Sequence, residues 1–163
     1  MLFFKRKGKS EEDIVQRAVK ETIPDISNLV SSCEQQLREL DDILYGIALY
    51  FECISLLHAD QPTVIETYRK QLRNIIQRGK ELASEASELL TRINKDPRTR
   101  EALKGIRLNL AEEIPESEPI IKRAKLLVQL YEKYFPGRPR SQEFTEDELF
   151  TLIEASADKF NEL

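Results

Sequence analysis

The only histidine of the chain, His58, is the first place to look for acid–base or nucleophilic chemistry. Ser55 precedes it by three residues and Asp60 follows it by two. A Ser-His-Asp triad needs side chains from separate rigid elements and a set of oxyanion donors, which three residues at the end of one helix do not supply. Cys53 lies about 140° round a helix from His58, which disfavours a thiolate–imidazole pair. We interpret His58 as a helix-end residue that interacts with the last carbonyls.

Metal and phosphate chemistry find equally little support in the sequence. A di-metal centre in a helical bundle needs two Glu-x-x-His pairs, and one histidine cannot supply them. The sequence has no Cys-x-x-Cys pair, no zinc-ligand spacing and no Gly-rich phosphate loop. Acidic residues at helical spacing in 81–88 and 112–116 are typical of solvated faces. The sequence therefore predicts a protein that is not an enzyme and that carries no cofactor or metal.

Glu52 is the one carboxylate whose sequence neighbours are nearly all apolar. Buried without a partner, it would be costly and would indicate function. The alternatives are that it emerges at an edge of the fold or pairs with Arg69 or Arg73. A catalytic or small-molecule pocket is kept as one hypothesis, with these candidate residues: Glu52, His58, Tyr45 and Tyr50.

The first residues, MLFFKRKGKS, combine apolar side chains with four cations. They can contact an anionic membrane, pack on the fold or stay flexible, and the sequence leaves these alternatives open. A second basic face is predicted on a later helix, opposite its apolar side. The candidate interaction residues are Leu2, Phe3, Phe4, Lys5, Arg6, Lys7, Arg100, Lys104 and Arg107.

Composition limits which partners the protein can bind and in which cellular compartment it is expected. The net charge of −4 disfavours nucleic acid, and no aromatic platform is interleaved with the cations. The most apolar stretch, 43–57, is shorter than the ~20 residues of a membrane-spanning helix. Cys33 and Cys53 would lie about 30 Å apart on one helix, which excludes a bridge between them. Two unpaired thiols favour the cytoplasm, with peripheral contact at the inner face of the membrane as an alternative.

Apolar spacing predicts helices throughout the chain and no strands. A short helix is expected over about 10–22, ended by the Pro24 region, and a second, longer one follows. Asp96-Pro97 opens a helix that is expected to reach about Ala111. Another helix ends near Phe135. Thr145 and Glu148 form a capping box for a last helix, whose apolar face is predicted to carry Leu149, Phe150, Ile153, Ala157 and Phe160.

Two heptad seams, in 26–54 and 65–93, meet across a short loop and predict a long antiparallel hairpin. Folding at that loop pairs Phe51 with Tyr68 and Leu40 with Gly79. It also predicts ion pairs of Asp41 and Asp42 with Arg78 and Lys80. Between Ile43 and Leu57 the helix is apolar almost all round, so further helices or a second subunit must cover it.

The predicted fold is all-α: a bundle of about six helices built on a long antiparallel, coiled-coil-like hairpin. Its organisation is a basic and apolar tag (1–9), a helical bundle (10–135) with the hairpin at 25–94, a linker (136–142) and an acidic C-terminal helix (143–163) that packs on the bundle or on a partner. A helical interaction module that acts through a protein partner or a homo-oligomer is the function we expect: an adaptor, assembly factor or regulatory subunit. A peripheral membrane protein is the alternative.

Overall fold

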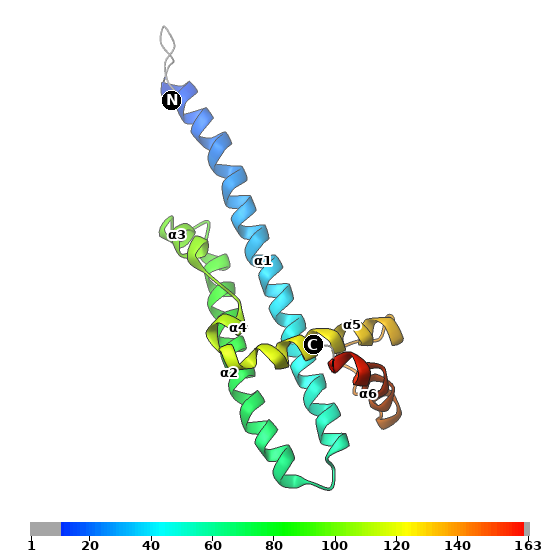
Figure 1. The fold of residues 1–163 in the computed structure, drawn as a ribbon. Helices are drawn as coiled ribbons and strands as arrows, with labels where there is room; N and C mark the ends of the chain where they lie inside the picture. The colour runs from blue at the N-terminus through cyan, green and yellow to red at the C-terminus, as the bar shows by residue number, and fades with distance from the viewer. Residues whose placement is uncertain (1–10, 162–163) are drawn as a thin grey trace. The chain divides into compact units, whose positions relative to one another are not determined.

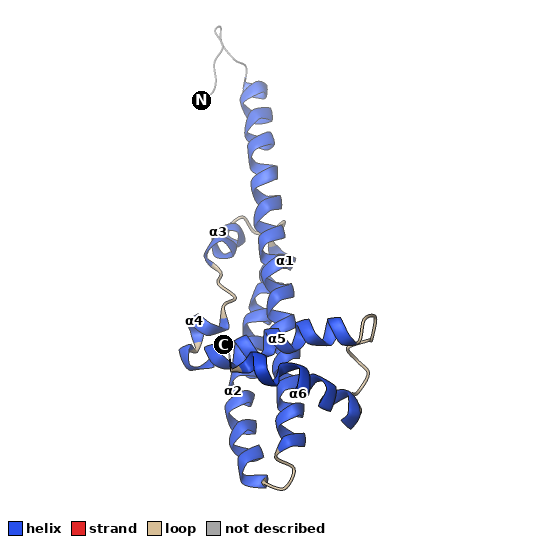
Figure 2. Ribbon diagram, turned by 45° about the vertical axis from the view of Figure 1, so that its right-hand side comes forward, coloured by secondary structure: helices blue, strands red, loops and turns tan. Residues whose placement is uncertain are grey.

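The computed structural model describes residues 11–161, and the side chains that it describes begin at Ile26. Within that range the chain is all-α, with six α-helices, one short 3-10 helix and no strand (Figure 2). The α-helices are α1 (Glu11–Leu57), α2 (Pro62–Arg92), α3 (Arg98–Gly105), α4 (Leu110–Glu113), α5 (Glu118–Tyr134) and α6 (Glu146–Phe160); the 3-10 helix η1 (Pro115–Ser117) lies between α4 and α5. The predicted fold class is confirmed.

Two of the predicted helix boundaries are wrong. The expected short helix over 10–22 does not exist as a separate element, because α1 continues through Pro24 without a break. An interior proline removes one backbone donor and crowds the carbonyl four residues before it, which favours a kink or a break; here the residues on both sides of Pro24 are helical nonetheless. The helix expected to reach Ala111 ends at Gly105, and α4 begins only at Leu110, where Asn109 caps it by accepting a hydrogen bond from the Ala111 amide at 3.0 Å.

The chain divides into two compact units, Met1–Gln36 with Ala86–Ile106, and Leu37–Glu85 with Arg107–Leu163. In the first, Cys33 and Ala86 are buried on α1 and α2, and α3 buries Leu103. The predicted division into tag, bundle, linker and C-terminal helix stays a prediction.

In the second unit, α1 ends at Leu57 and the chain turns at once into α2. The turn is closed by the Gln61 amide, which donates to the His58 carbonyl at 2.8 Å. Pro62 then opens α2, where its missing N–H costs nothing. Two contacts join the helices near this end, the rings of Tyr50 and Tyr68 and Arg69 over Phe51, and a third, Leu44 against Gly79, lies further from the turn. The pairings predicted along the whole seam stay a prediction.

Helices α5 and α6 cover the apolar part of α1. Figure 1 shows α5 lying across α1 and α2, with α6 beside it. The backbones of α1 and α5 meet at Gly46, where a Cβ would lie 2.9 Å from the Cβ of Ala124. Leu49 and Tyr50 are buried under these helices, as the all-round apolar pattern predicted. The chain's own helices therefore supply the cover on this side.

The capping box of α6 is confirmed. The Thr145 hydroxyl accepts from the Glu148 amide at 3.2 Å, and a Glu148 carboxylate oxygen accepts from the Thr145 amide at 2.9 Å. The predicted apolar face is rotated, however: Leu149, Leu152 and Ser156 are buried, while Phe150 is exposed. Leu149, Leu152 and Ser156 lie on one side of α6. This side packs against α5, and the side that carries Phe150 faces solvent.

Candidate functional site

The second unit contains a cleft of about 610 Å³ between α1, α2 and the chain that joins α5 to α6. Its size lies within the range of ligand-binding pockets. Sixteen residues line it: Tyr45, Ala48, Leu49, Phe51, Glu52, Arg69, Leu72, Arg73, Ile76, Gln77, Lys80, Arg140, Ser141, Gln142, Glu143 and Phe144.

Helical spacing places these side chains on one face of each helix. On α1, Tyr45, Ala48 and Glu52 are three and four residues apart. On α2, Arg73 lies four residues after Arg69, and Lys80 lies seven residues, or about two turns, after Arg73. Ala48 is exposed, although its neighbours Ile47 and Leu49 are buried in the core. At Ala48 the cleft is thus a strip of the apolar part of α1 that α5 and α6 leave open to solvent.

The third wall, Arg140 to Phe144, is held by Arg138, whose side chain is only 7% exposed. Arg138 donates to both carboxylate oxygens of Glu148 at 3.0 Å and to the Gln142 carbonyl at 2.8 Å. It also donates to the Glu143 carbonyl and stacks 4.0 Å over the Phe144 ring. The carbonyl of Arg138 itself accepts a bond from the Tyr131 hydroxyl. These bonds order a segment that has no regular secondary structure.

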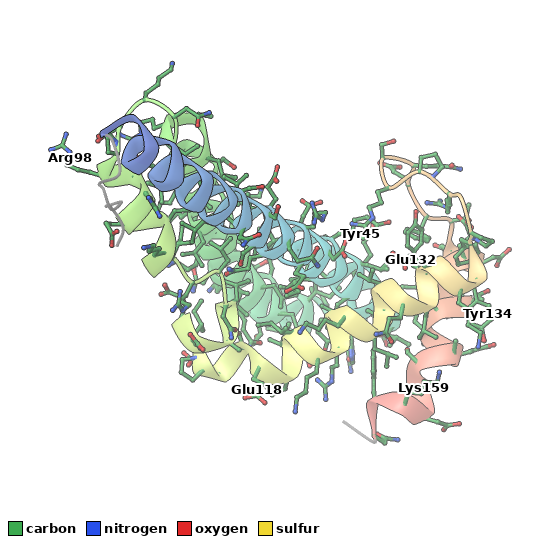
Figure 3. The ribbon with its side chains drawn as sticks, turned by 90° about the horizontal axis from the view of Figure 1, so that it is seen from above. Tyr45, Arg98, Glu118, Glu132, Tyr134 and Lys159 are labelled. Carbon is green, nitrogen blue, oxygen red and sulfur yellow. The ribbon has the colours of Figure 1, made fainter. Side chains whose placement is uncertain are left out.

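Arg140 fixes the same wall to α1 and α5. It pairs with Asp42 at 2.8 Å and with Glu132 at 3.5 Å, and it lies 4.7 Å over the Tyr45 ring. Figure 3 shows Tyr45 on the side of α1 that faces the chain between α5 and α6, with Glu132 on α5. The predicted ion pairs of Asp41 and Asp42 with Arg78 and Lys80 are therefore wrong. Asp42 pairs with Arg140 instead. Arg78 pairs with three other carboxylates, those of Glu81, Glu85 and Glu113.

Two cations of the cleft, Arg73 and Lys80, have no ion pair within the described part of the chain, whereas Arg69 pairs with Glu66. Glu52 and Glu143, two carboxylates of the cleft, also have no ion pair within the described part of the chain. Burial raises the pKa of Glu52, and the nearby negative charge of Glu143 raises it further, against a smaller lowering by Arg138. The cleft thus offers unpaired charges of both signs beside apolar side chains.

The Tyr45 hydroxyl is buried, with no hydrogen-bond partner of good geometry among residues 26–161. Burial, followed by the neighbouring Tyr131, raises its pKa to about 12, although Arg138 and Arg140 act in the opposite direction. Tyr45 is therefore neutral at physiological pH and contributes an aromatic wall to the cleft rather than a charge.

The predicted pocket residues are only partly brought together. Tyr45 and Glu52 line the cleft, and Glu52 is exposed at its edge, without an ion pair to Arg69 or Arg73. His58 lies in the α1–α2 turn, where its Nδ1 is 2.7 Å from Oε1 of Gln61. Tyr50 is buried in contact with the Tyr68 and Phe160 rings, and its hydroxyl accepts from Arg123 at 3.2 Å.

The predicted interaction residues do not form one surface in the described structure. Leu2, Phe3, Phe4, Lys5, Arg6 and Lys7 lie outside the described residues. Arg100 and Lys104 lie on α3, where Lys104 pairs with Glu101 at 3.5 Å. Arg107 follows the end of α3 and belongs to the second unit.

Arg140 was missed as a cleft residue because it belongs to the proline- and arginine-rich segment 136–142 that reads as a linker, and Phe144 was missed because it was assigned to the C-terminal helical segment, 143–163. The available signal was that linker's two arginines beside an aromatic cluster at the end of α5. Arg73 and Lys80 were predicted only as ion-pair partners, Arg73 for Glu52 and Lys80 for Asp41 or Asp42. Nothing in the sequence indicated that α5 and α6 would leave these two cations beside an open strip of α1.

Among the described residues, no group of three His, Cys, Asp or Glu side chains is arranged to hold a metal ion, and no helix has the length and apolar character needed to cross a membrane. Comparison with known proteins found no family model that matches the chain, and no curated protein or solved structure with significant similarity.

Proposed function

We propose that this protein is a non-enzymatic interaction module, an adaptor or assembly factor, that holds a short segment of a partner protein in the cleft between α1, α2 and the 140–144 segment. The observation that carries the proposal is the open strip at Ala48, which lies among buried core residues and beside the unpaired cations Arg73 and Lys80. An apolar groove with charged edges is the usual receptor for an amphipathic segment.

The energetics of the cleft favour this use. Burying one Leu or Phe side chain of a partner against Ala48 and Ile76 would contribute roughly 1.5–3 kcal/mol. Arg138 and Arg140 already hold the 140–144 wall in place, so this segment loses little conformational entropy when a partner binds. The cleft gives a partner both an anchor point and a preformed wall.

A selection of random displayed peptides on the purified chain tests the proposal and requires no assumption about the sequence of the partner. The matched pair of variants is Ala48→Trp, which fills the cleft from an exposed helical position, and Ala157→Trp, which adds the same bulk on an exposed site of α6 outside the cleft. Selected peptides should bind the native chain and Ala157→Trp equally and lose at least about tenfold in affinity on Ala48→Trp.

Peptides that bind both tryptophan variants equally would contradict the proposal, as would a selection that enriches nothing. Circular dichroism of both variants verifies that the helices are intact. Loss of binding can then be assigned to the filled cleft.

The proposal places the protein in the cytoplasm, where the two free, buried thiols of Cys33 and Cys53 stay reduced. Peripheral contact of residues 1–9 with an anionic inner leaflet is compatible with it. Flotation with vesicles of anionic lipid, for the full chain and a chain without residues 1–9, tests that contact. Equal recovery of both chains in the unbound fraction would contradict it.

A further inference from the structure

Contacts between α1 and α2 show which residues lie at the same level along the cleft. Arg69 of α2 lies over the Phe51 ring at 5.5 Å, so the neighbouring Glu52 is at the level of Arg69. Leu44 packs where a Cβ on Gly79 would lie, at 2.6 Å, so Lys80 is close to the level of Leu44. The cleft therefore extends from Glu52, near the closed end of the helix pair, toward Lys80.

The unpaired charges are separated along this length. Glu52 and Glu143 are close enough for the Glu143 charge to affect the titration of Glu52, and they mark the acidic end of the cleft. From the level of Arg69, Arg73 lies roughly 6 Å and Lys80 roughly 16 Å along the helix axis, at 1.5 Å per residue. Because Arg69 is paired with Glu66, the unpaired charges of the cleft are thus acidic at one end and basic along the remainder.

Apolar side chains lie between the two charged parts. Leu72 is buried, Ile76 is half-buried and Ala48 is exposed opposite them on α1. A partner side chain placed here is removed from water, which strengthens the charge interactions on either side of it.

We propose that the occupant of the cleft is a peptide segment of mixed charge: a Lys or Arg side chain toward Glu52 and Glu143, an apolar side chain between Ala48 and Ile76, and an Asp or Glu toward Arg73 and Lys80. This inference rests on the proposed function and specifies its partner. A length of roughly 16 Å matches about five residues of extended peptide or about eleven residues of helix.

Charge complementarity argues against the chain's own first residues as the occupant. Residues 1–9 carry four cations and no acidic residue. Such a segment offers nothing to Arg73 and Lys80, and like charges placed side by side oppose binding.

The test uses the peptides selected on the full native chain. Arg73→Glu combined with Lys80→Glu should weaken the best peptide by about tenfold or more, and changing the peptide's acidic residue to Lys should restore binding to this variant. The control pair, Lys70→Glu with Arg98→Glu, gives the same change in net charge at exposed sites that do not line the cleft. It should leave the affinity within about twofold.

Three outcomes would overturn the inference. Peptides that lose affinity for the Ala48→Trp variant, but whose sequences share no arrangement of basic, apolar and acidic residues, would refute the mixed-charge segment and leave the proposed function intact. Binding that is insensitive to Ala48→Trp refutes both. Self-association that Ala48→Trp abolishes, measured by light scattering of the native chain, assigns the cleft to a second copy instead.

Discussion

Arg138 and Glu148 form a two-pronged ion pair in which Nε and Nη2 of the guanidinium donate to the two carboxylate oxygens, each at 3.0 Å. The same carboxylate accepts from the Thr145 amide and so completes the cap of α6. One pair of residues therefore joins the start of α6 to the segment that forms the third wall of the cleft. The stability of α6 and the shape of the cleft are linked through it.

Arg138→Ala should lower the free energy of unfolding by about 2–3 kcal/mol, because the hydrogen bonds of a buried cation to the Gln142 and Glu143 carbonyls are lost. Arg138→Lys should recover only part of this, since an ammonium group cannot bind the carboxylate with two parallel bonds. Urea unfolding measures the change, and hydrogen exchange should show faster exchange in residues 140–145. The control is Arg98→Ala, whose side chain is 91% exposed. Equal stability of Arg138→Ala and the native chain would refute the role of Arg138.

The Glu148 carboxylate gives the fold an acid-sensitive component. The hydrogen bond from the Arg138 side chain, followed by that from the Thr145 amide, holds the pKa of Glu148 below its usual value. Its stabilising contribution is therefore fully present above the pKa of an unfolded glutamate, about 4.3, and is lost as the pH falls through the lower folded value. The urea midpoint of unfolding should fall as the pH is lowered from neutral to ~3. The midpoint of the Glu148→Gln variant should fall less over the same pH range. Parallel curves for both chains would contradict this.

Glu52 should act with the opposite sign. Burial, followed by the charge of Glu143, raises the pKa of Glu52. A carboxyl with a raised folded pKa costs stability above that pKa, and the cost disappears as the pH falls below the unfolded value. Glu52→Gln should thus stabilise the chain at neutral pH, by less than about 1 kcal/mol because the side chain is largely exposed. The gain should vanish below pH ~4. Thermal unfolding at both pH values measures it, and a gain that persists in acid would contradict the sign.

The sequence predicted the helices best where a local rule determines them. The capping box at Thr145 and Glu148 depends on four consecutive residues, and the buried α2 positions from Leu72 to Ala86 follow a repeat within one helix. The continuation of α1 through Pro24 was missed because a proline disfavours the interior of a helix, and this local rule predicted a break where the chain stays helical.

The cleft could not be predicted because it depends on what packs against α1. Tyr45, Ala48, Leu49 and Tyr50 all read as apolar positions off the seam, yet α5 and α6 bury Leu49 and Tyr50 and leave Ala48 exposed. Arg140 contacts Asp42 and Tyr45 from nearly a hundred residues away in the chain. Spacing within a helix carries no information about such a contact.

Gly46 should be irreplaceable, because a Cβ there would collide with the Ala124 carbonyl and lie 2.8 Å from its carbon, both backbone atoms. Gly46→Ala should destabilise by about 1–3 kcal/mol, since the strain of separating α1 from α5 exceeds the gain of about 1 kcal/mol in helix propensity. Gly105→Ala is the matched control: nothing lies within 4 Å of its Cβ position. Urea unfolding should show a loss for Gly46→Ala only, and equal effects of the two substitutions would refute the close approach.

Both thiols should be unreactive in the folded protein. Burial, followed by the charge of Glu52, raises the pKa of Cys53 to about 12, and burial followed by Glu34 raises the pKa of Cys33. The thiolate is the reactive form, and each sulfur belongs to a residue that is at most 5% exposed. A disulfide reagent at pH 8 should therefore label neither cysteine until urea unfolds the chain, after which both should react. Labelling of Cys53 that is faster than global unfolding would contradict this, because it would show that the packing around this part of α1 opens locally.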